Sequence, residues 1–177
     1  KLFFDPILST DRSVSCASCH DPAHGFADDR ALSPGVNGAL TVRNTPSLLN
    51  RGFGRRFSWL GQVETLEAQV LLPIANEREM GLSLIDAVDR LRGDGDYERL
   101  FRAAFDAPPD LEKLSTVLST FVARVPSPES AVDRFQSGDF TALLPRCTFP
   151  PPGSEVECAV SGGADSTALL VLAALQS

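Results

Sequence analysis

Two cysteines and a histidine at fixed spacing, Cys16-Ala17-Ser18-Cys19-His20, constrain this chain more than any other feature. A C-x-x-C-H is the attachment signature of a c-type haem. The two thiols add across the two vinyl groups of one porphyrin, and the imidazole that follows is placed to ligate the iron. We therefore expect one covalent haem c, attached at Cys16 and Cys19, with His20 as the iron ligand.

A zinc site, or a chance C-x-x-C beside a surface histidine, is the alternative interpretation of this motif. Structural zinc needs a second pair of ligands at suitable spacing. The other histidine is His24, and the remaining cysteines, Cys147 and Cys158, lie far along the chain and eleven residues apart. The sequence therefore favours haem over zinc.

Composition limits the partners and the compartment. The 177 residues suffice for one domain, or for one domain and a fragment, and 43% of them are hydrophobic. The net charge of −7 argues against a nucleic-acid partner. The chain contains no run of 18 apolar residues, so we expect no membrane span. It starts at Lys1 and contains no signal peptide, so we infer a periplasmic location from the type of haem alone.

The pattern of residues predicts a mainly α fold whose first third consists of loops. Residues 5–60 hold much of the Gly and Pro, and such a stretch needs a cofactor to wrap. From Val63 onward, apolar residues recur at helical spacing. We expect helical segments through Leu66, Val70 and Ile74 (interrupted by Pro73), over 82–91 (stopped by Gly93), from a cap at Asp96 to Phe105, and after a cap at Asp110, with Leu111, Leu114, Leu118, Phe121 and Val122 on one face and Pro126 and Pro128 beyond its end.

Several motifs around the haem site follow one another in a recognisable order. They are LFFDPILSTDRSVSCASCHDPAHGFADD, RNTPSLLN, a Phe-x-Trp-x-Gly, TLEAQVLLP and NEREMG. This order resembles the N-terminal, peroxidatic haem domain of the bacterial di-haem cytochrome c peroxidases and the related MauG-type enzymes, over residues 1–140. The resemblance implies a cytochrome c-like haem domain that reduces hydrogen peroxide with electrons from a cytochrome c or a cupredoxin.

The resemblance also implies roles for single residues. Trp59 matches the tryptophan between the two haems, and Gln69 matches the distal glutamine. Pro73 matches a distal-pocket proline, and Glu79 matches the distal acid–base carboxylate. Asn44 matches a residue near the inter-haem calcium of the family, which makes calcium a second expected cofactor.

The chemistry of these residue types agrees with those roles. Peroxide reduction needs a proton moved from one peroxide oxygen to the other, and one carboxylate in an apolar pocket can accept and return it. Each residue also has a plainer interpretation: a solvated helix-end carboxylate for Glu79, a core aromatic for Trp59, and a turn residue capping its own backbone for Asn44. The neighbouring carboxylates that could be confused with Glu79 are Glu64, Glu67 and Glu77.

Two departures from the family concern the iron and its surroundings. The usual Trp-Asp-Gly-Arg is Trp59-Leu60-Gly61-Gln62 here, so a charged pair is missing. Family members that need reductive activation carry a distal histidine about sixteen residues after the proximal one, by resemblance, and that position is Val36. We expect His24 to lie at the surface, and the haem to be five-coordinate, as in MauG-type enzymes, and open to peroxide.

The chain carries one C-x-x-C-H, whereas the family carries a second in its C-terminal half. From about Leu143 onward the sequence is LLPRCTFPPPGSEVECAVSGGADSTALLVLAALQS, in which we expect a strand over 156–160 and a helix over 167–175. A Gly-rich loop between a strand and a helix presents N–H groups to phosphate. This loop resembles the pyrophosphate loop of N-type ATP pyrophosphatases, at the N-terminal start of a tRNA(Ile)-lysidine synthase, and consists of Ser161, Gly162, Gly163, Asp165 and Ser166.

We interpret this tail as non-functional, because a nucleotide fold needs several strands and a lone strand buries little surface. The domain division is then a haem domain over 1–140 and a partial tail over 141–177 that is not an independent domain, which is typical of a chimera. A genuine fusion that retains only the loop is the alternative. Cys147 and Cys158 are then cysteines inherited with the tail, and the alternative is a disulfide between them in an oxidising compartment.

Three classes of function remain open on the sequence. The favoured one is a c-type haem peroxidase, incomplete because the second haem domain is missing from this chain. The runner-up is a mono-haem electron carrier, which normally has a sixth protein ligand to iron. The single methionine, Met80, stands beside Glu79 as in the peroxidase family, which favours the enzyme. A fragment of an ATP-dependent tRNA-lysidine synthase is the third class.

Overall fold

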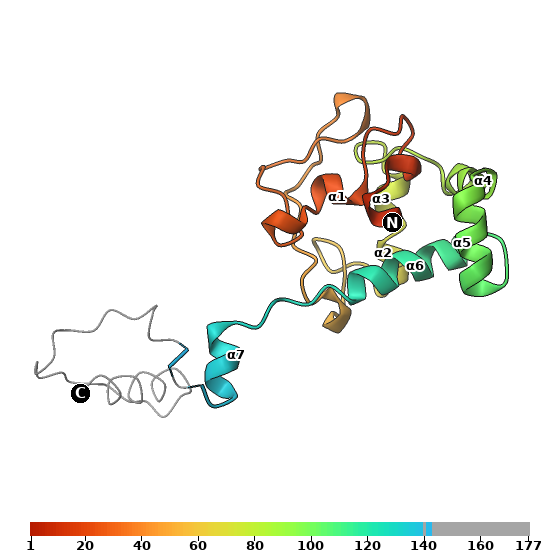
Figure 1. Ribbon diagram of the computed structural model, residues 1–177. Coiled ribbons are helices and arrows are strands. Elements are labelled where there is room, and N and C mark those ends of the chain that lie inside the picture. Colours follow the sequence, from red (N-terminus) through yellow and green to blue (C-terminus); the bar gives the residue numbers. More distant parts are fainter. Residues whose placement is uncertain (140, 143–177) are drawn as a thin grey trace, which may run out of the picture. The chain divides into compact units, whose positions relative to one another are not determined.

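The computed structural model describes residues 1–139, 141 and 142, and most of its regular structure is helical (Figure 1). The chain forms two compact units, Lys1–Ser127 and Pro128–Ser177. The expected strand, phosphate loop, helix and cysteine pair of the tail lie outside the described residues, and the division of the chain at residue 140 stays a prediction. The described part of the second unit holds α7 (Ala131–Gln136), which begins with a capping box between Ser130 and Asp133.

Loops and short turns dominate the first part of the first unit, as the sequence predicts. Single 3₁₀ turns occupy Leu2–Phe4 and Pro6–Leu8, and α1 (Cys16–Cys19) is the first α-helical turn. Three isolated antiparallel bridges close the loops that follow: Asp21 with Ala27, Pro34 with Leu40, and Phe57 with Val63. The remaining 3₁₀ turns are Pro22–His24, Val36–Gly38 and Arg51–Phe53.

Five helices follow in the order expected from the sequence. The stretch around Pro73 forms two short helices, α2 (Leu66–Gln69) and α3 (Leu72–Ala75), because proline starts a helix readily but cannot continue one. The longer helices are α4 (Leu84–Gly93), α5 (Gly95–Phe105) and α6 (Leu111–Ala123).

The helix caps confirm one prediction and correct another. Asp110 caps α6 by accepting a hydrogen bond from the Lys113 N–H at 2.8 Å. The prediction that Asp96 caps α5 is wrong. Asp94 accepts from the N–H groups of both Asp96 and Tyr97 at 3.1 Å, so the helix begins at Gly95. Two aspartates at this spacing both suit a helix start, and the side chain that reaches two N–H groups becomes the cap.

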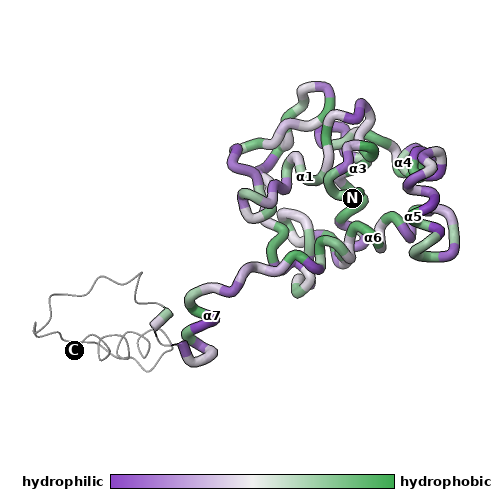
Figure 2. Tube along the Cα trace, viewed as in Figure 1, coloured by the Kyte–Doolittle hydropathy of each residue, from purple (hydrophilic) through white to green (hydrophobic). Residues whose placement is uncertain are grey.

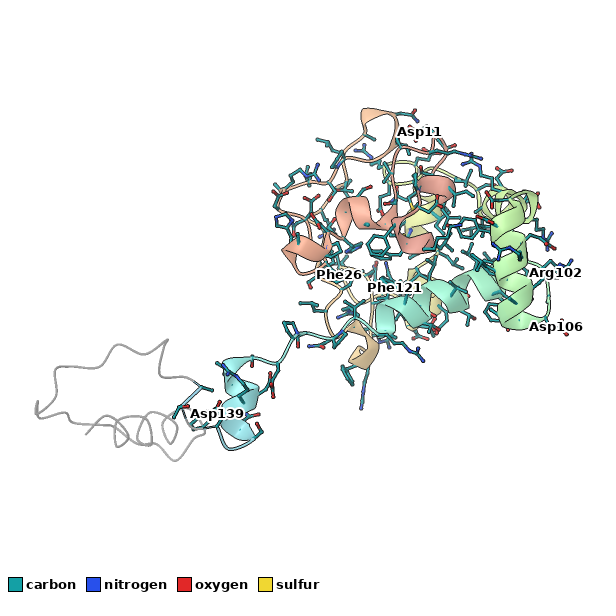
Figure 3. The ribbon with its side chains drawn as sticks, viewed as in Figure 1. Asp11, Phe26, Arg102, Asp106, Phe121 and Asp139 are labelled. Carbon is teal, nitrogen blue, oxygen red and sulfur yellow. The ribbon has the colours of Figure 1, made fainter. Side chains whose placement is uncertain are left out.

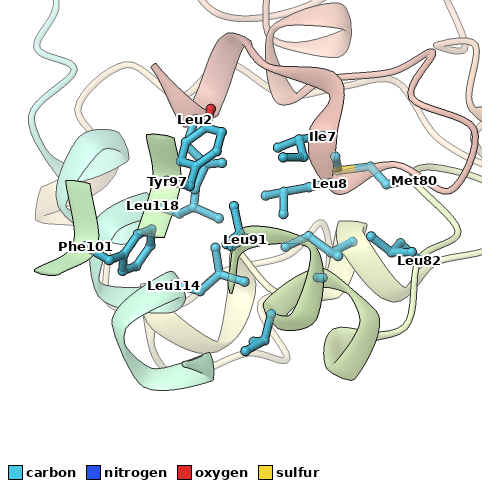
Figure 4. Close-up of a cluster of buried hydrophobic side chains, with 13 residues drawn as sticks. Leu2, Ile7, Leu8, Met80, Leu82, Leu91, Tyr97, Phe101, Leu114 and Leu118 are labelled. Atoms are coloured by element: carbon cyan, nitrogen blue, oxygen red, sulfur yellow. The ribbon is translucent and has the colours of Figure 1, made fainter. Parts of the chain in front are cut away.

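The core of the first unit joins the N-terminal turns to α4, α5 and α6 (Figure 4). Hydrophobic residues recur along α6 (Figure 2). Leu114, Leu118 and Val122 of this helix are buried. Leu111, expected on the same face, is 40% exposed and is the first residue of α6. The buried cluster consists of Leu2, Ile7, Leu8, Ile74, Met80, Leu82, Ala87, Val88, Leu91, Tyr97, Phe101, Leu114 and Leu118.

Hydrogen bonds from α4 and α5 hold the segment that precedes the Cys-x-x-Cys-His motif. The guanidinium of Arg90 donates to the backbone carbonyls of Ile7, Ser9 and Thr10 at 3.1, 2.6 and 2.9 Å. Tyr97 donates its hydroxyl to a carboxylate oxygen of Asp5 at 2.7 Å. The helical core therefore fixes the position of the chain just before the haem motif.

Candidate functional site

The Cys-x-x-Cys-His motif forms one helical turn followed directly by the histidine. Ser15 and Ser18 form a capping box at the start of α1, in which the Ser15 N–H donates to the Ser18 hydroxyl at 3.0 Å. The backbone N–H of His20 donates to the Cys16 carbonyl at 2.9 Å. This turn brings both thiols and the imidazole to the same end of one cavity, as the attachment chemistry requires.

The hydrogen bond of His20 leaves one ring nitrogen available. Nδ1 lies 3.0 Å from the backbone carbonyl oxygen of Phe26, so this nitrogen carries the proton and Nε2 keeps its lone pair. Burial lowers the pKa of His20, and the hydrogen bond to Phe26 opposes that shift without overcoming it. A neutral imidazole oriented by a backbone carbonyl is the usual state of a metal-bound histidine.

Both motif cysteines are free thiols and are half-buried. Burial raises the pKa of Cys16 to about 12, and burial also raises the pKa of Cys19 against the opposing hydrogen bond of Ser33. Redox-active and metal-binding cysteines have lowered pKa values instead. Among the residues that the structure describes, no cluster of three or more His, Cys, Asp or Glu side chains could hold a metal ion. The surroundings of the two thiols therefore give no support to the zinc interpretation.

A cavity of about 510 Å³ opens beside this motif, which is within the usual range of cofactor pockets, about 300–1,000 Å³. The ring of Phe3 lines it and lies 4.5 Å from the ring of Phe121 and 6.1 Å from that of Phe26, centre to centre. Figure 3 labels Phe26 and Phe121. All eight haem-domain residues singled out in the sequence line this cavity: Cys16, Cys19, His20, Asn44, Trp59, Gln69, Pro73 and Glu79.

The short helices α2 and α3 supply two of these side chains. Thr65 caps α2 by accepting from the Ala68 N–H at 3.2 Å, and Gln69 is the last residue of that helix. The Gln69 amide oxygen is buried without a hydrogen-bond partner in the described part of the chain. Pro73 lies in the first turn of α3, where proline is favoured. A buried amide oxygen without a partner is costly and points to a polar group that completes the site.

Glu79 follows α3 in a tight turn and is half-buried. Its Oε1 accepts a hydrogen bond from the Asn76 amide at 2.7 Å. Burial raises the pKa of Glu79, and the hydrogen bond from Asn76 lowers it in part. The carboxyl group therefore gains and loses a proton closer to neutral pH than an ordinary glutamate does.

Trp59 and Asn44 differ from their plainer interpretations. The Trp59 side chain is 54% exposed and is not part of the core, so the core-aromatic interpretation is wrong. Asn44 donates to the backbone carbonyl of Arg30 at 2.7 Å, so it joins two loops rather than capping its own backbone. Its expected role near calcium stays a prediction.

Val36, where the resemblance places the additional distal histidine of some family members, does not line the cavity. It is 1% exposed. Its N–H donates to the Glu79 carbonyl at 2.9 Å, which fixes this loop against the turn that holds Glu79. His24 is exposed and lies 3.1 Å from a carboxylate oxygen of Asp21, which agrees with a surface role.

Among the polar residues that line the cavity, Asn76, Arg43 and Arg51 were given no role in the sequence analysis. Asn76 stands three residues before Glu79, and this spacing is a signal that could have identified it, because asparagine side chains often hydrogen-bond across a tight turn. Arg43 is the first residue of the RNTPSLLN motif, which carries part of the resemblance, whereas no sequence signal identified Arg51.

The residues present fit a c-type haem. They provide two thiols and one available imidazole nitrogen at one end, an apolar cavity of suitable size, and a buried amide oxygen without a partner. Together with the helical fold, these features define a cytochrome c-like haem domain.

A family comparison agrees with this class: residues 1–141 match the family model described as di-haem cytochrome c peroxidase. The methylamine utilization protein MauG of Methylorubrum extorquens is 39% identical over 144 residues, which are 80% of this chain and 41% of the relative. The cytochrome c551 peroxidase of Pseudomonas aeruginosa is 33% identical over 147 residues, 81% of this chain and 42% of the relative. The chain belongs to the di-haem cytochrome c peroxidase family, a family of haem c oxidoreductases.

Solved structures give the same fold. A MauG-like protein associated with microbial copper homeostasis superposes with a TM-score of 0.71 at 33% identity, over 85% of this chain and 43% of that one. The diheme peroxidase BthA from Burkholderia thailandensis shares the fold, with a TM-score of 0.61 at 24% identity over 85% of this chain and 42% of that one. The chain spans about two fifths of the length of the curated relatives named above.

Proposed function

We propose that this chain forms the peroxide-reducing haem domain of a di-haem peroxidase, with one haem c attached at Cys16 and Cys19 and held by His20. The bound haem supplies an iron that binds peroxide and passes electrons to it. One observation carries the proposal: Glu79 lines the same cavity as the attachment motif. Its carboxyl group is half-buried and has a raised pKa.

Glu79 moves the proton in this proposal. The reaction takes up two electrons and two protons and converts hydrogen peroxide to two molecules of water. The ionised carboxylate accepts the proton of one peroxide oxygen and returns it to the other, which then leaves as water. A carboxyl group whose pKa is raised toward the working pH suits both halves of this transfer.

The other cavity residues bind peroxide or contribute apolar surface. Gln69 directs an amide group into the cavity without titrating, so it can hydrogen-bond peroxide at any pH. Pro73 contributes apolar surface and adds no backbone donor. Trp59, exposed at the cavity, faces the electron source, which we take to be a second haem domain supplied in turn by a cytochrome c or a cupredoxin in the periplasm. Calcium near Asn44 belongs to the same proposal.

The experiment is a Glu79→Gln substitution in the haem-loaded chain. Peroxide-dependent oxidation of the haem, followed by stopped-flow absorbance, should slow by about 10²-fold or more, the scale of one positioned proton-transfer group. The haem content should stay the same, because Glu79 takes no part in attachment. Glu77→Gln is the matched control, because this substitution removes the same charge. Glu77 is exposed and does not line the cavity.

An unchanged rate in Glu79→Gln would contradict the proposal. Slowing of equal size in Glu77→Gln would also contradict it, since the effect would then follow the net charge rather than the cavity carboxylate.

A further inference from the structure

The turn between α3 and α4 places Asn76 and Glu79 together. The Asn76 backbone carbonyl accepts from the N–H groups of Glu79 and Gly81, both at 2.9 Å. The Asn76 side-chain oxygen accepts from the Arg78 N–H at 3.0 Å. The side-chain nitrogen is thereby directed toward Glu79, to which it donates at 2.7 Å. One amide therefore does two separate things: its oxygen builds the turn and its nitrogen holds the carboxylate.

The backbone of Glu79 is held by other segments. Val36 donates its N–H to the Glu79 carbonyl at 2.9 Å, and the next residue, Met80, accepts at its carbonyl from Thr10 at 2.8 Å. Gly35 packs so closely beneath the turn that a Cβ there would lie 2.0 Å from the Arg78 carbonyl oxygen. The backbone is thus fixed, whereas the carboxylate has Asn76 as its side-chain partner within the described residues.

We propose that Asn76 is a positioning residue of the peroxide site: its amide holds Glu79 Oε1 and leaves Oε2 to exchange the proton with peroxide. The inference rests on the proposed role of Glu79 and adds a residue that acts through it. A donor fixed on one oxygen restricts rotation of the carboxyl group and favours its ionised form.

The Asn76 amide is the side-chain group that acts directly on the pKa of Glu79. Burial raises the pKa of Glu79, and the Asn76 hydrogen bond is the contact that lowers it. The other titratable or charged groups lining the cavity are Cys16, Cys19, His20, Arg43 and Arg51, which come from α1 and from the loops over 20–65. Loss of the Asn76 donor should therefore raise the pKa of Glu79 further.

The decisive variant is Asn76→Asp in the haem-loaded full chain. Aspartate keeps the side-chain oxygen that accepts from Arg78, so the turn is preserved, but it has no N–H to donate and adds a like charge beside Glu79. The ionised form of Glu79 is the active base. With a higher pKa, the carboxylate becomes protonated at a higher pH as the solution is acidified, and the base is then lost. The acid limb of the peroxide rate profile should move to higher pH, with unchanged haem content and melting temperature.

Asn76→Ala should move the acid limb in the same direction and slow the reaction about threefold to tenfold at pH 6, the scale of the net contribution of one hydrogen bond. Gln62→Ala is the matched control: it removes an exposed amide that does not line the cavity, and its profile should equal that of the parent chain.

Each outcome separates the inference from the proposed function. A parental pH profile in Asn76→Asp, with slowing confined to Asn76→Ala, would show that the amide only builds the turn and would overturn the inference. In a Glu79→Gln background, Asn76→Asp should have no effect on the profile, and a shift that persists there would also overturn the inference. A parental rate in Glu79→Gln alone would instead contradict the proposed function.

Discussion

Single hydrogen bonds determine the chemistry that the individual residues of this site can perform. The Phe26 carbonyl fixes the proton of His20 on Nδ1, and the Asn76 amide holds one oxygen of Glu79. The Cys-x-x-Cys-His motif could be predicted from the sequence because its chemistry requires neighbouring residues. The partner of His20 could not, because a backbone carbonyl has no sequence signature.

Met80 distinguishes a peroxidase from an electron carrier. The residue is 3% exposed, belongs to the buried cluster and also lines the cavity, so it is the methionine to test as an iron ligand. By resemblance, Met80 stands beside Glu79 as in the peroxidases, and Val36 stands where some family members carry an additional histidine. We therefore expect a high-spin ferric haem without a sixth protein ligand at neutral pH, both in the parent chain and in Met80→Leu. This substitution roughly conserves volume, so it should fold.

Electron paramagnetic resonance of the two haem-loaded proteins makes this test, with His24→Ala as a companion variant. A low-spin signal in the parent chain that disappears in either variant would identify a sixth protein ligand and favour the electron carrier.

The order of the helical segments after Val63 was predictable, but the turn α1, the division into α2 and α3, and the helix ends were not. Apolar spacing gave α4, α5 and α6 to within two residues at their starts. Helix ends depend on which of two nearby residues becomes the cap. At α5 these are Asp94 and Asp96, and the sequence alone does not show which of them accepts the N–H hydrogen bonds. The loops over 20–65 were predictable only as loops, because distant contacts such as Asn50 with Ser127 place them.

The buried face of α6 gives an element-scale prediction. Leu114 is 0% exposed within the cluster, whereas Leu111, one turn earlier, is 40% exposed. Leu114→Ala should lower the free energy of unfolding by about 2–5 kcal/mol through lost burial and the cavity left behind. Leu111→Ala should change it by about 0.5 kcal/mol or less.

Urea unfolding of the haem-loaded proteins, followed by circular dichroism, compares the two variants. Equal losses of stability would mean that α6 does not bury the face described here.

At the scale of the whole molecule, the chain divides into a unit that contains the entire cavity and a second unit that begins at Pro128. Within the described residues, no helix is both long and apolar enough to cross a membrane. Sequence motifs predicted the family because their order survives in the chain, and the family model covers 1–141. The tail after residue 142 was interpretable only by resemblance.

Removal of residues 143–177 tests that interpretation. All lining residues of the cavity lie before residue 123, so haem content and peroxide reactivity should not change in the shortened chain. Calorimetry with ATP and magnesium should give no heat of binding for either length. Heat that disappears with the deletion would show a working nucleotide site and contradict the chimera.

The central claim is that the cavity of the first unit holds one covalent haem. The most direct test is the mass of the intact protein, expressed with the cytochrome c maturation machinery and extracted with acidified acetone to remove any haem that is not covalently bound. The account predicts the polypeptide mass increased by a single haem, and loss of that increase when Cys16 and Cys19 are both replaced by alanine. An unmodified polypeptide mass for the parent chain would contradict the account.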